Sequence, residues 1–340
     1  MSESLLSVVI VNWNAKEYIA GCLKYVLNSN YPHFEVILVD NHSEDGSINV
    51  LRDALSKDEL NRIDFILNDK NYGAAYALNQ GAERAKGKYI TFLATDTKVE
   101  KKCFFELIKV FETDDAIGAV SSKLLMMNDH VRIDSAGEYL SQYGILIQRH
   151  AGQEIDRGQF DSMVDIFSAK GTALTVRKKV FDGAGGFPED YFMFLEETDL
   201  CWRVWLSGYR IVFVPQARIY HACGVSINKS PKRNYLVKYY GTRNYIYTLL
   251  KNLSLKNILA IVSVCVLMWL SLAVYLGMRG RVKEARYVAL GILWNIVHIN
   301  KIRETRRMIQ KRTVVTDGML FPKIMQRIPI SYLYDRVRTW

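Results

Sequence analysis

The segments "SVVIVNWN" (residues 7–14) and "EVILVDNHSEDGS" (residues 35–47) decide the fold of this chain. Each starts with β-branched and aliphatic residues, the pattern of a strand buried on both faces, and each ends in polar residues. Residues 15–28, which lie between them, place apolar side chains on one helical face. A strand, a helix and a second buried strand predict a βαβ unit with parallel strands.

The same alternation continues through roughly the first third of the chain. Further strands and helices are predicted at 64–67, 88–94, 48–56 and 74–86. Asp40 ends one strand and Asp96 follows another, at the edge where open α/β sheets bind ligands. We therefore predict an α/β fold with a Rossmann-like, mostly parallel sheet flanked by helices.

The region from residue 120 to residue 229 has a less regular pattern. Residues 133–149 are typical of a hairpin, and residues 168–181 of a strand that enters a helix. An acidic helix follows a loop rich in glycine and proline, and residues 209–221 predict a pair of strands. No internal repeat separates these elements, so we expect them to complete the same domain.

Composition limits the class of protein. With 340 residues, 49% apolar and 24% charged, the chain is expected to fold into a sizeable core. Five cysteines without paired spacing argue against a disulfide framework or a structural zinc site and favour a reducing compartment. The N-terminus lacks a signal-peptide pattern, so we expect the body in the cytoplasm. Neither GxGxxG nor GxxxxGK[ST] occurs, which argues against dinucleotide oxidoreductases and P-loop NTPases.

Charge and hydropathy set the last third apart. Residues 230–340 carry 20 Lys and Arg against 4 Asp and Glu, whereas residues 1–229 carry 25 against 31. Residues 257–278 contain no charge, and as a helix this run is about as long as a bilayer's hydrocarbon core is thick. A second uncharged run, residues 287–300, is too short to span a membrane upright.

The polar ends of the first two strands carry a family resemblance. "VVIVNWN" followed by "VILVDNHSEDGS" resembles the start of the inverting nucleotide-sugar glycosyltransferases of family 2, which have the GT-A fold. The resemblance implies that Asn12, Trp13 and Asn14 line the nucleotide and that Asp40 accepts the imide N–H of its base. A carboxylate can accept this proton from uracil or thymine, and an aromatic ring offers a stacking face. The alternative for Asp40 is a cap on the turn after the strand.

A second segment adds donor and metal candidates. Residues 68–97, which end in "ATDT", resemble the family's N-x-G-x5-N-x-G segment and the strand that leads to its metal-binding Asp. The resemblance implies that Asn71, Gly73 and Asn79 lie at the donor and that Asp96 holds a divalent cation, Mn²⁺ or Mg²⁺. Ala94 replaces the first Asp of the family's DxD motif, as in rhamnosyltransferase-like members with a single Asp.

The acidic helix resembles the family's catalytic segment. In "GGFPEDYFMFLEETDLCWRVWLSGYRI" (residues 185–211), Glu197 stands where the family has its general base, an Asp. The resemblance implies that Glu196 contacts the acceptor or the donor sugar. Asp199 is a third candidate, although its spacing of four from Arg203 favours a helix salt bridge that orients the base.

The last motif is "ARIYHACGVS" (residues 217–226), which resembles the family's His-x-x-Gly-x-Ser. Here the resemblance implies that His221 completes the metal site with Asp96. A structural histidine in an apolar neighbourhood is the alternative.

We expect three parts: a GT-A catalytic domain at 1–229, a linking helical segment at 230–256 and a helical, basic, membrane-associated tail at 257–340. The expected activity is metal-assisted, inverting transfer of a sugar from a dTDP- or UDP-sugar to a glycan or a polyprenyl-linked saccharide. A non-catalytic nucleotide-sugar-binding or assembly subunit of a polysaccharide-synthesis complex is the alternative. Nucleic acid is not an expected partner, because the basic residues flank an apolar run.

The tail should hold the protein on the cytoplasmic face of the cell membrane. A single span at 257–278 would carry a basic flank outward, against the positive-inside tendency, so residues 257–312 are expected to lie at the membrane surface as a hairpin or in-plane helices. A buried helical pair or a contact within a homo-oligomer is the soluble alternative.

Overall fold

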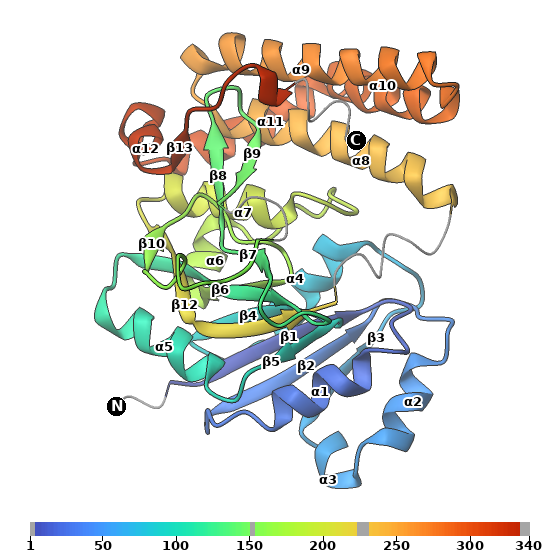
Figure 1. The fold of residues 1–340 in the computed structure, drawn as a ribbon, viewed down its shortest axis with the longest axis vertical. Helices are drawn as coiled ribbons and strands as arrows, with labels where there is room; N and C mark the ends of the chain where they lie inside the picture. The colour runs from blue at the N-terminus through green and yellow to red at the C-terminus, as the bar shows by residue number, and fades with distance from the viewer. Residues whose placement is uncertain (1–3, 150–153, 223–230, 334–340) are drawn as a thin grey trace.

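The strands predicted from the N-terminal third form one half of a large mixed sheet (Figure 1). The computed structural model describes residues 4–149, 154–222 and 231–333. The parallel strands lie in the order β4 (Tyr89–Ala94), β1 (Leu6–Asn12), β2 (Phe34–Asp40) and β3 (Ile63–Leu67). Their register pairs Asn12 with Asp40, so the polar ends of β1 and β2 are neighbours at the carboxyl edge.

The other half of the sheet mixes strand directions. Beyond β4 follow β11 (Ala173–Arg177), β6 (Ile117–Met126), β12 (Arg210–His221) and β10 (Val164–Asp165). The short strands β5 (Thr97–Val99) and β7 (Ile133–Ser135) pair with β12 and β6. The predicted strand-to-helix step is confirmed, because β11 runs directly into α6 (Lys178–Ala184).

The prediction of a strand pair at 209–221 is wrong. This segment forms one long strand, β12, whose register against β6 shifts between Val214 and Arg218. Pro215 lies in this irregular stretch, where its missing N–H costs no ladder hydrogen bond. The bulge lets the strand continue to His221 at the site edge, where a turn would have reversed it.

Helices cover both faces of the sheet, as predicted. Alternate residues of β1 point to opposite faces, so Val8 packs in one core cluster and Val9 in the other. On the side of Val8 lie α1 (Ile19–Leu27), α2 (Ser47–Ala54) and α5 (Cys103–Thr113); α3 (Lys57–Leu60) follows α2. On the side of Val9 lie α4 (Ala74–Arg84), α6 and α7 (Glu196–Leu206).

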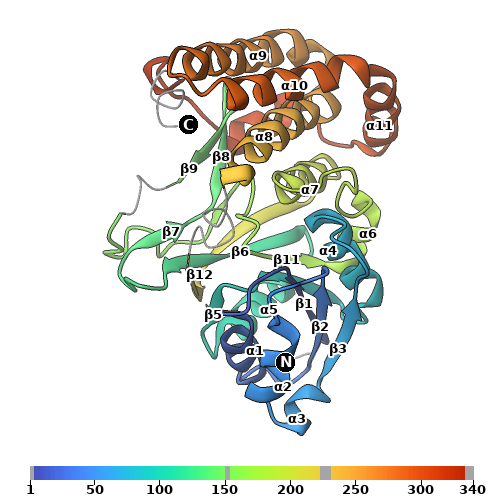
Figure 2. The ribbon, with the colours of Figure 1, turned by 90° about the vertical axis from the view of Figure 1, so that its right-hand side faces the viewer.

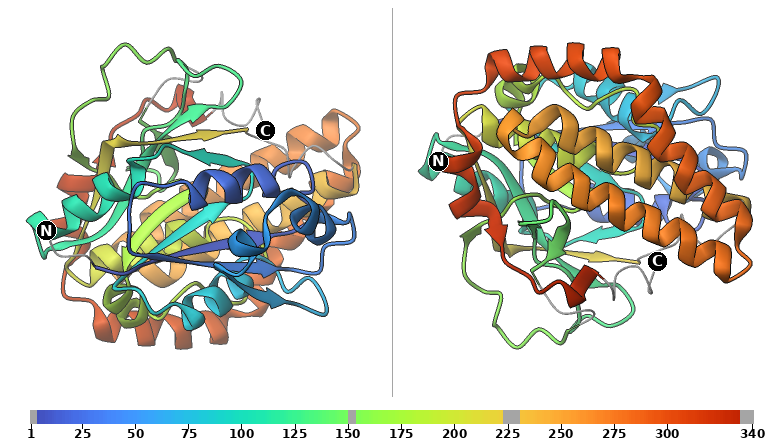
Figure 3. Two further views of the ribbon diagram at one scale, coloured as in Figure 1. Left: turned by 90° about the horizontal axis from the view of Figure 1, so that it is seen from below. Right: turned by 90° about the horizontal axis from the view of Figure 1, so that it is seen from above.

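A helical layer ends the molecule along its long axis (Figures 1 and 2). It consists of α8 (Pro231–Asn252), α9 (Leu255–Met278), α10 (Val282–Val297), α11 (Ile299–Arg312) and α12 (Asp317–Ile324). The turn predicted between the two apolar runs is present, with Gly280 at φ +73°. Figure 3 shows the layer from above, and Figure 2 places α9 and α10 beyond α8 as seen from the sheet.

Contacts cross both predicted domain boundaries, at residues 229 and 256. The division into three parts stays a prediction. The hairpin predicted at 133–149 exists as β8 (Glu138–Ser141) and β9 (Leu146–Gln148), and β13 (Met325–Gln326) from the tail adds a parallel strand to β8. Asn244 of α8 donates to the backbone carbonyls of Met193 and Phe194, which precede α7. Helix α8 therefore supports the loop that leads to Glu196 and Glu197 at the start of α7.

Candidate active site

A cavity of about 230 Å³ opens at the carboxyl edge of the parallel strands. Trp13 comes from the end of β1, Asn71 and Gly73 from the start of α4, Asp96 from the turn after β4, and Glu196 from the first turn of α7. Residues predicted for nucleotide, metal and catalysis therefore line one cavity, although they are more than 180 positions apart in the chain.

Asp40 lies beside this cavity in a network that fixes its orientation. Asn12 Nδ2 donates to Asp40 Oδ1 at 2.7 Å, and the Ser43 N–H donates to Oδ2 at 3.0 Å. Asn12 is fully buried, so it positions Asp40 and does not line the cavity. Asn14, at φ +52°, accepts the Glu44 N–H with its side chain and so ties the two strand ends together.

Asn41 connects the nucleotide side to α4; it lies in the quoted motif after Asp40, but the resemblance gave it no role. Its Nδ2 donates to Asn71 Oδ1 at 3.0 Å and to the Gly73 carbonyl at 3.1 Å, while its Oδ1 accepts the Tyr72 N–H. Asn71 also accepts the Gly73 N–H. The buried amide thus holds the loop before α4 against the end of β2.

Gly73 and Asn79 of the donor segment behave differently. Gly73 has φ +89°, and a Cβ there would lie 2.6 Å from the Phe192 carbonyl oxygen, so only glycine allows this close approach. Asn79 lies outside the cavity lining and exchanges two hydrogen bonds of 2.9 Å with the backbone of Phe187. Both residues fix the loop that leads to α7.

The two predicted metal ligands are adjacent. Pairing of β5 with β12 sets His221 opposite Thr97, and His221 Nε2 lies 3.3 Å from Asp96 Oδ2. His221 Nδ1 lies 2.9 Å from Asp134 Oδ2, and Lys170 Nζ holds the other oxygen of Asp134 at 2.6 Å. The sequence carried no signal for Asp134, since only the pairing of β7 with β6 brings it here.

These residues fit a divalent cation that keeps open positions for a ligand. Asp96 offers an oxygen and His221 offers Nε2. The other ring nitrogen of His221, Nδ1, is held by the Asp134 carboxylate, as is usual for a metal-binding histidine. Within the described residues, no group of three or more His, Cys, Asp or Glu could hold a metal. Gly224 and Ser226, the other matches of this motif, lie outside the described residues.

The acidic pair sits on a strained start of α7. Phe194 and Leu195, which precede the helix, have φ of +68° and +69°, where residues other than glycine are uncommon. Burial raises the pKa of Glu196 to about 7. Burial and, second, the charge of Glu196 raise the pKa of Glu197 well above its usual range. Each acid therefore holds a proton more strongly than an exposed carboxyl group would.

The two carboxylates face the cavity from neighbouring positions. Glu196 lines it, and within the described part of the chain its Oε2 has no hydrogen-bond partner. Glu197 Oε1 accepts the Gly171 N–H at 3.2 Å, and a Cβ at residue 171 would lie 2.9 Å from the Glu197 carboxyl carbon. Because Gly171 also lines the cavity, glycine there keeps Glu197 close to the opening.

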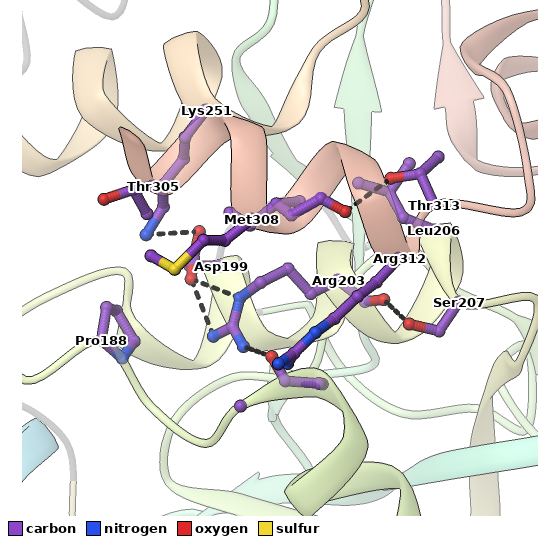
Figure 4. A pocket seen from close by; sticks show the side chains of 13 residues that line it. Pro188, Asp199, Arg203, Leu206, Ser207, Lys251, Thr305, Met308, Arg312 and Thr313 are labelled. Atoms are coloured by element: carbon purple, nitrogen blue, oxygen red, sulfur yellow. Dashed lines mark hydrogen bonds and ion pairs between the residues drawn. The ribbon is translucent and has the colours of Figure 1, made fainter. Parts of the chain in front are cut away.

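Asp199 points away from the cavity, into a separate pocket between α7 and α11 (Figure 4). Its carboxylate binds Arg203 at 2.8 Å, Lys251 at 3.0 Å and Asn252 at 2.7 Å. Burial works to raise the pKa of Asp199, but the charges of Lys251 and Arg203 outweigh it and lower this pKa. The salt bridge expected from the spacing is confirmed, and Asp199 is not brought to the cavity.

Comparison with known proteins agrees with this arrangement. Residues 7–160 match the model of glycosyl transferase family 2. These residues, a little under half of the chain, therefore form a glycosyl transferase family 2 domain. It is 34% identical to glycosyltransferase GlyG of Streptococcus pneumoniae serotype 4 over 34% of this chain and 38% of that relative.

A longer but less identical match is found with a polysaccharide synthase. A poly-beta-1,6-N-acetyl-D-glucosamine synthase of Staphylococcus aureus is 27% identical over 62% of this chain and 48% of its own length. The chain thus spans less than half the length of these curated relatives. The structure of mannosyltransferase PcManGT from Pyrobaculum calidifontis, in complex with GDP-Man and Mn²⁺, has a TM-score of 0.55 at 16% identity and covers 86% of each chain. This likeness confirms the predicted GT-A fold.

Proposed function

We propose that this family 2 protein transfers a sugar from a nucleotide-sugar, a dTDP- or UDP-sugar, to an acceptor hydroxyl with inversion. One observation carries the proposal: a single cavity gathers Trp13, Asp96 and Glu196, with Asp40 and Glu197 beside it. An aromatic face, a metal-binding carboxylate and acids with raised pKa are the three components that this reaction needs.

The nucleotide would bind at the ends of β1 and β2. Asp40 accepts one hydrogen bond on each oxygen, from Asn12 and Ser43, which leaves lone pairs for the imide N–H of uracil or thymine. Trp13 supplies the ring for stacking. The Asn12 amide keeps the Asp40 carboxylate oriented before the nucleotide arrives, so binding needs little rearrangement.

Asp96 and His221 would hold a divalent cation, Mn²⁺ or Mg²⁺, together with the diphosphate oxygens of the donor. When bound, such a cation stabilises the negative charge of the departing nucleoside diphosphate. Asp134 holds the imidazole of His221, and Lys170 holds Asp134. These contacts orient the His221 ring for binding a cation, although the protein offers fewer than three ligands of its own among the described residues.

Glu197 is the proposed general base. It accepts the proton of the acceptor hydroxyl while the hydroxyl oxygen forms a bond to the anomeric carbon and the bond from that carbon to the diphosphate oxygen breaks. A single displacement inverts the anomeric configuration. Glu196, which lines the cavity, would contact the acceptor or the donor sugar. Asp199 supports the helix through its ion pairs.

The acceptor is proposed to be a glycan, preferably a polyprenyl-linked saccharide, at the cytoplasmic face of the cell membrane. Helix α9 is long and apolar enough to cross a membrane by length and composition. The S. aureus relative is named for the synthesis of a polysaccharide, which supports this class of acceptor. A homo-oligomer is compatible with this proposal.

A panel of nucleotide-sugars with Mn²⁺ or Mg²⁺, scored for binding and for hydrolysis, tests the function. We expect one dTDP- or UDP-sugar to be hydrolysed slowly and only with metal. If a donor binds but is not turned over, even when membrane extracts are added as a source of acceptor, the protein would be the non-catalytic subunit. The Ala94 that replaces the first Asp of the motif is the reason to test this alternative.

A further inference from the structure

Helices α9 and α10 lie at one end of the molecule (Figures 1 and 2), and both carry exposed apolar side chains. Leu259 is 79% exposed, and Ile296 and Val297 are 65% and 67% exposed. The exposed apolar side chains recur at helical spacing on both helices: Leu255, Leu259, Leu267, Leu270, Val274, Met278, Val282, Leu290, Leu293, Ile296 and Val297. We name these residues the apolar roof. Only 28% of the most apolar 18 residues of α9 is buried, so the described residues leave most of this stretch uncovered.

The inner faces of the same helices are fixed to the body. Cys265, Trp269 and Leu272 of α9 are buried in the core cluster that also contains the inner residues of α8. A Cβ at Gly291 of α10 would lie 2.8 Å from a backbone oxygen of α8, and Asn295 donates to the Arg243 carbonyl at 3.1 Å. The hairpin of α9 and α10 therefore packs along α8. Upright insertion of α9 into a bilayer would break these contacts.

Cations surround the apolar roof. Lys256 is exposed at the start of α9, Arg279, Lys283 and Arg286 are exposed near the turn to α10, and Arg303 and Arg307 are exposed on α11. Arg281 and Lys301 are exposed too, but they are paired with Glu284 and Asp190. The acidic residues in this stretch are Glu284 and Glu304. An apolar centre with a basic border matches a bilayer surface with anionic headgroups. A second copy of the chain would instead bring like charges together.

We propose that the apolar roof docks flat on an anionic lipid surface, so that α9 lies in the plane of the membrane and does not span it. The inference deepens the proposed membrane location and rests on the proposed function only for which face of the membrane is used. The sheet and its covering helices are then connected to the membrane-bound helices through α8. The active site lies on the side of the membrane from which the chain docks.

Flotation with vesicles tests the docking surface. We expect the purified full chain to float with phosphatidylcholine vesicles that contain phosphatidylglycerol, and about five-fold less for each cation removed in Arg279→Gln and Lys283→Gln. The triple variant Leu259→Glu, Leu267→Glu and Ile296→Glu should lose flotation and keep UDP binding. Leu67→Glu, on β3 at 61% exposure, is the matched control and should float normally.

Two outcomes of this experiment would overturn the proposal. One is a parent chain that does not float and forms a dimer in solution that the triple variant dissociates, which would assign the apolar roof to a second copy. The other is equal flotation of the triple variant and the parent. Failure of both UDP and dTDP to bind in all chains, with flotation intact, would contradict the proposed function alone.

Cysteine labelling separates in-plane docking from a span. Lys256→Cys and Arg279→Cys mark the two ends of α9, a helix about 36 Å long. With an impermeant thiol reagent and the parent chain as control, we expect neither position to label in intact cells and both to label in inside-out vesicles. Labelling of Arg279→Cys but not Lys256→Cys in intact cells would show a span and overturn the proposal. Labelling of both would leave the docking intact and contradict the cytoplasmic location.

Discussion

The first turn of α7 holds its three acids in two different ways. Asp199 is fully buried and bound by Arg203, Lys251 and Asn252, so its pKa is lowered. Glu196 and Glu197 are partly buried beside each other, and their pKa values are raised. Compensated charge stabilises the helix, whereas uncompensated charge beside a cavity marks a place where chemistry can occur.

The largest expected effect comes from breaking the compensated group. Asp199→Ala leaves the charges of Arg203 and Lys251 buried and unpaired, so the free energy of unfolding should fall by about 3–5 kcal/mol. Urea denaturation measures it. Asp182→Ala, which removes an exposed i,i+4 pair with Lys178, is the control and should cost less than about 1 kcal/mol. Equal losses in the two variants would show that burial of the Asp199 group has no special role.

The next effect tests the uncompensated pair. Glu197→Gln should keep donor binding and lower turnover by roughly 100-fold or more, because the amide cannot take the acceptor proton. Glu197→Asp, the family's own residue, should retain part of the activity. Steady-state kinetics beside Glu196→Gln decides between the two acids: if Glu196→Gln loses turnover and Glu197→Gln does not, the base is Glu196.

Metal-dependent binding should separate the two sides of the cavity. Asp96→Ala and His221→Ala should weaken metal-dependent donor binding, and Asp134→Asn should weaken it by about 10- to 100-fold through the orientation of His221. Asp40→Ala should weaken binding of donor and free nucleoside diphosphate with or without metal. Calorimetry with and without a chelator measures the difference. If the parent chain binds the donor equally well after chelation, neither Asp96 nor His221 serves as a metal ligand in donor binding.

The smallest expected effect is a pH dependence of stability. The pKa of Glu196 rises from 4.5 to about 7 on folding, so between these values the folded chain keeps a proton that the unfolded chain has lost. The free energy of unfolding should therefore fall as pH rises through this window, by about 1–3 kcal/mol. Glu196→Gln should flatten this part of the curve in melts at pH 5 and pH 8. A slope unchanged in the variant would assign the titration to another group.

Local pattern was enough for most of the elements, and the family resemblance led to several of the residues that line the cavity. Runs such as 7–12 and 35–40 are buried strands because their β-branched residues suit a pleat covered on both faces. The spacing of Asp199 and Arg203 predicted their ion pair, since residues four apart share a helix face. The motif positions of Trp13, Asn71, Asp96 and Glu196 also led to the cavity.

Other features had no local signal. Asp134 stands in a segment without a motif, and only strand pairing brings it to His221. Asn41 lies in a motif that gave it no role, and only the loop before α4 brings it to Asn71. The break expected within 209–221 depends on whether proline starts a turn or sits in a bulge, and the neighbouring strand β6 decides that. Asn79 has the same sequence signal as Asn71, yet its partner is the backbone of Phe187, 108 positions away.

The sequence by itself determined the layers of the fold, the family and the charge division between body and tail, because these depend on periodicity and composition along short stretches. The tertiary structure alone decided which acids on α7 are compensated and which face of α9 stays exposed. Both depend on long-range partners: Lys251 reaches Asp199 from α8, and α8 also covers the inner side of the apolar hairpin. A residue's burial and charge partners are set by what packs against it, which its own neighbours in sequence do not specify.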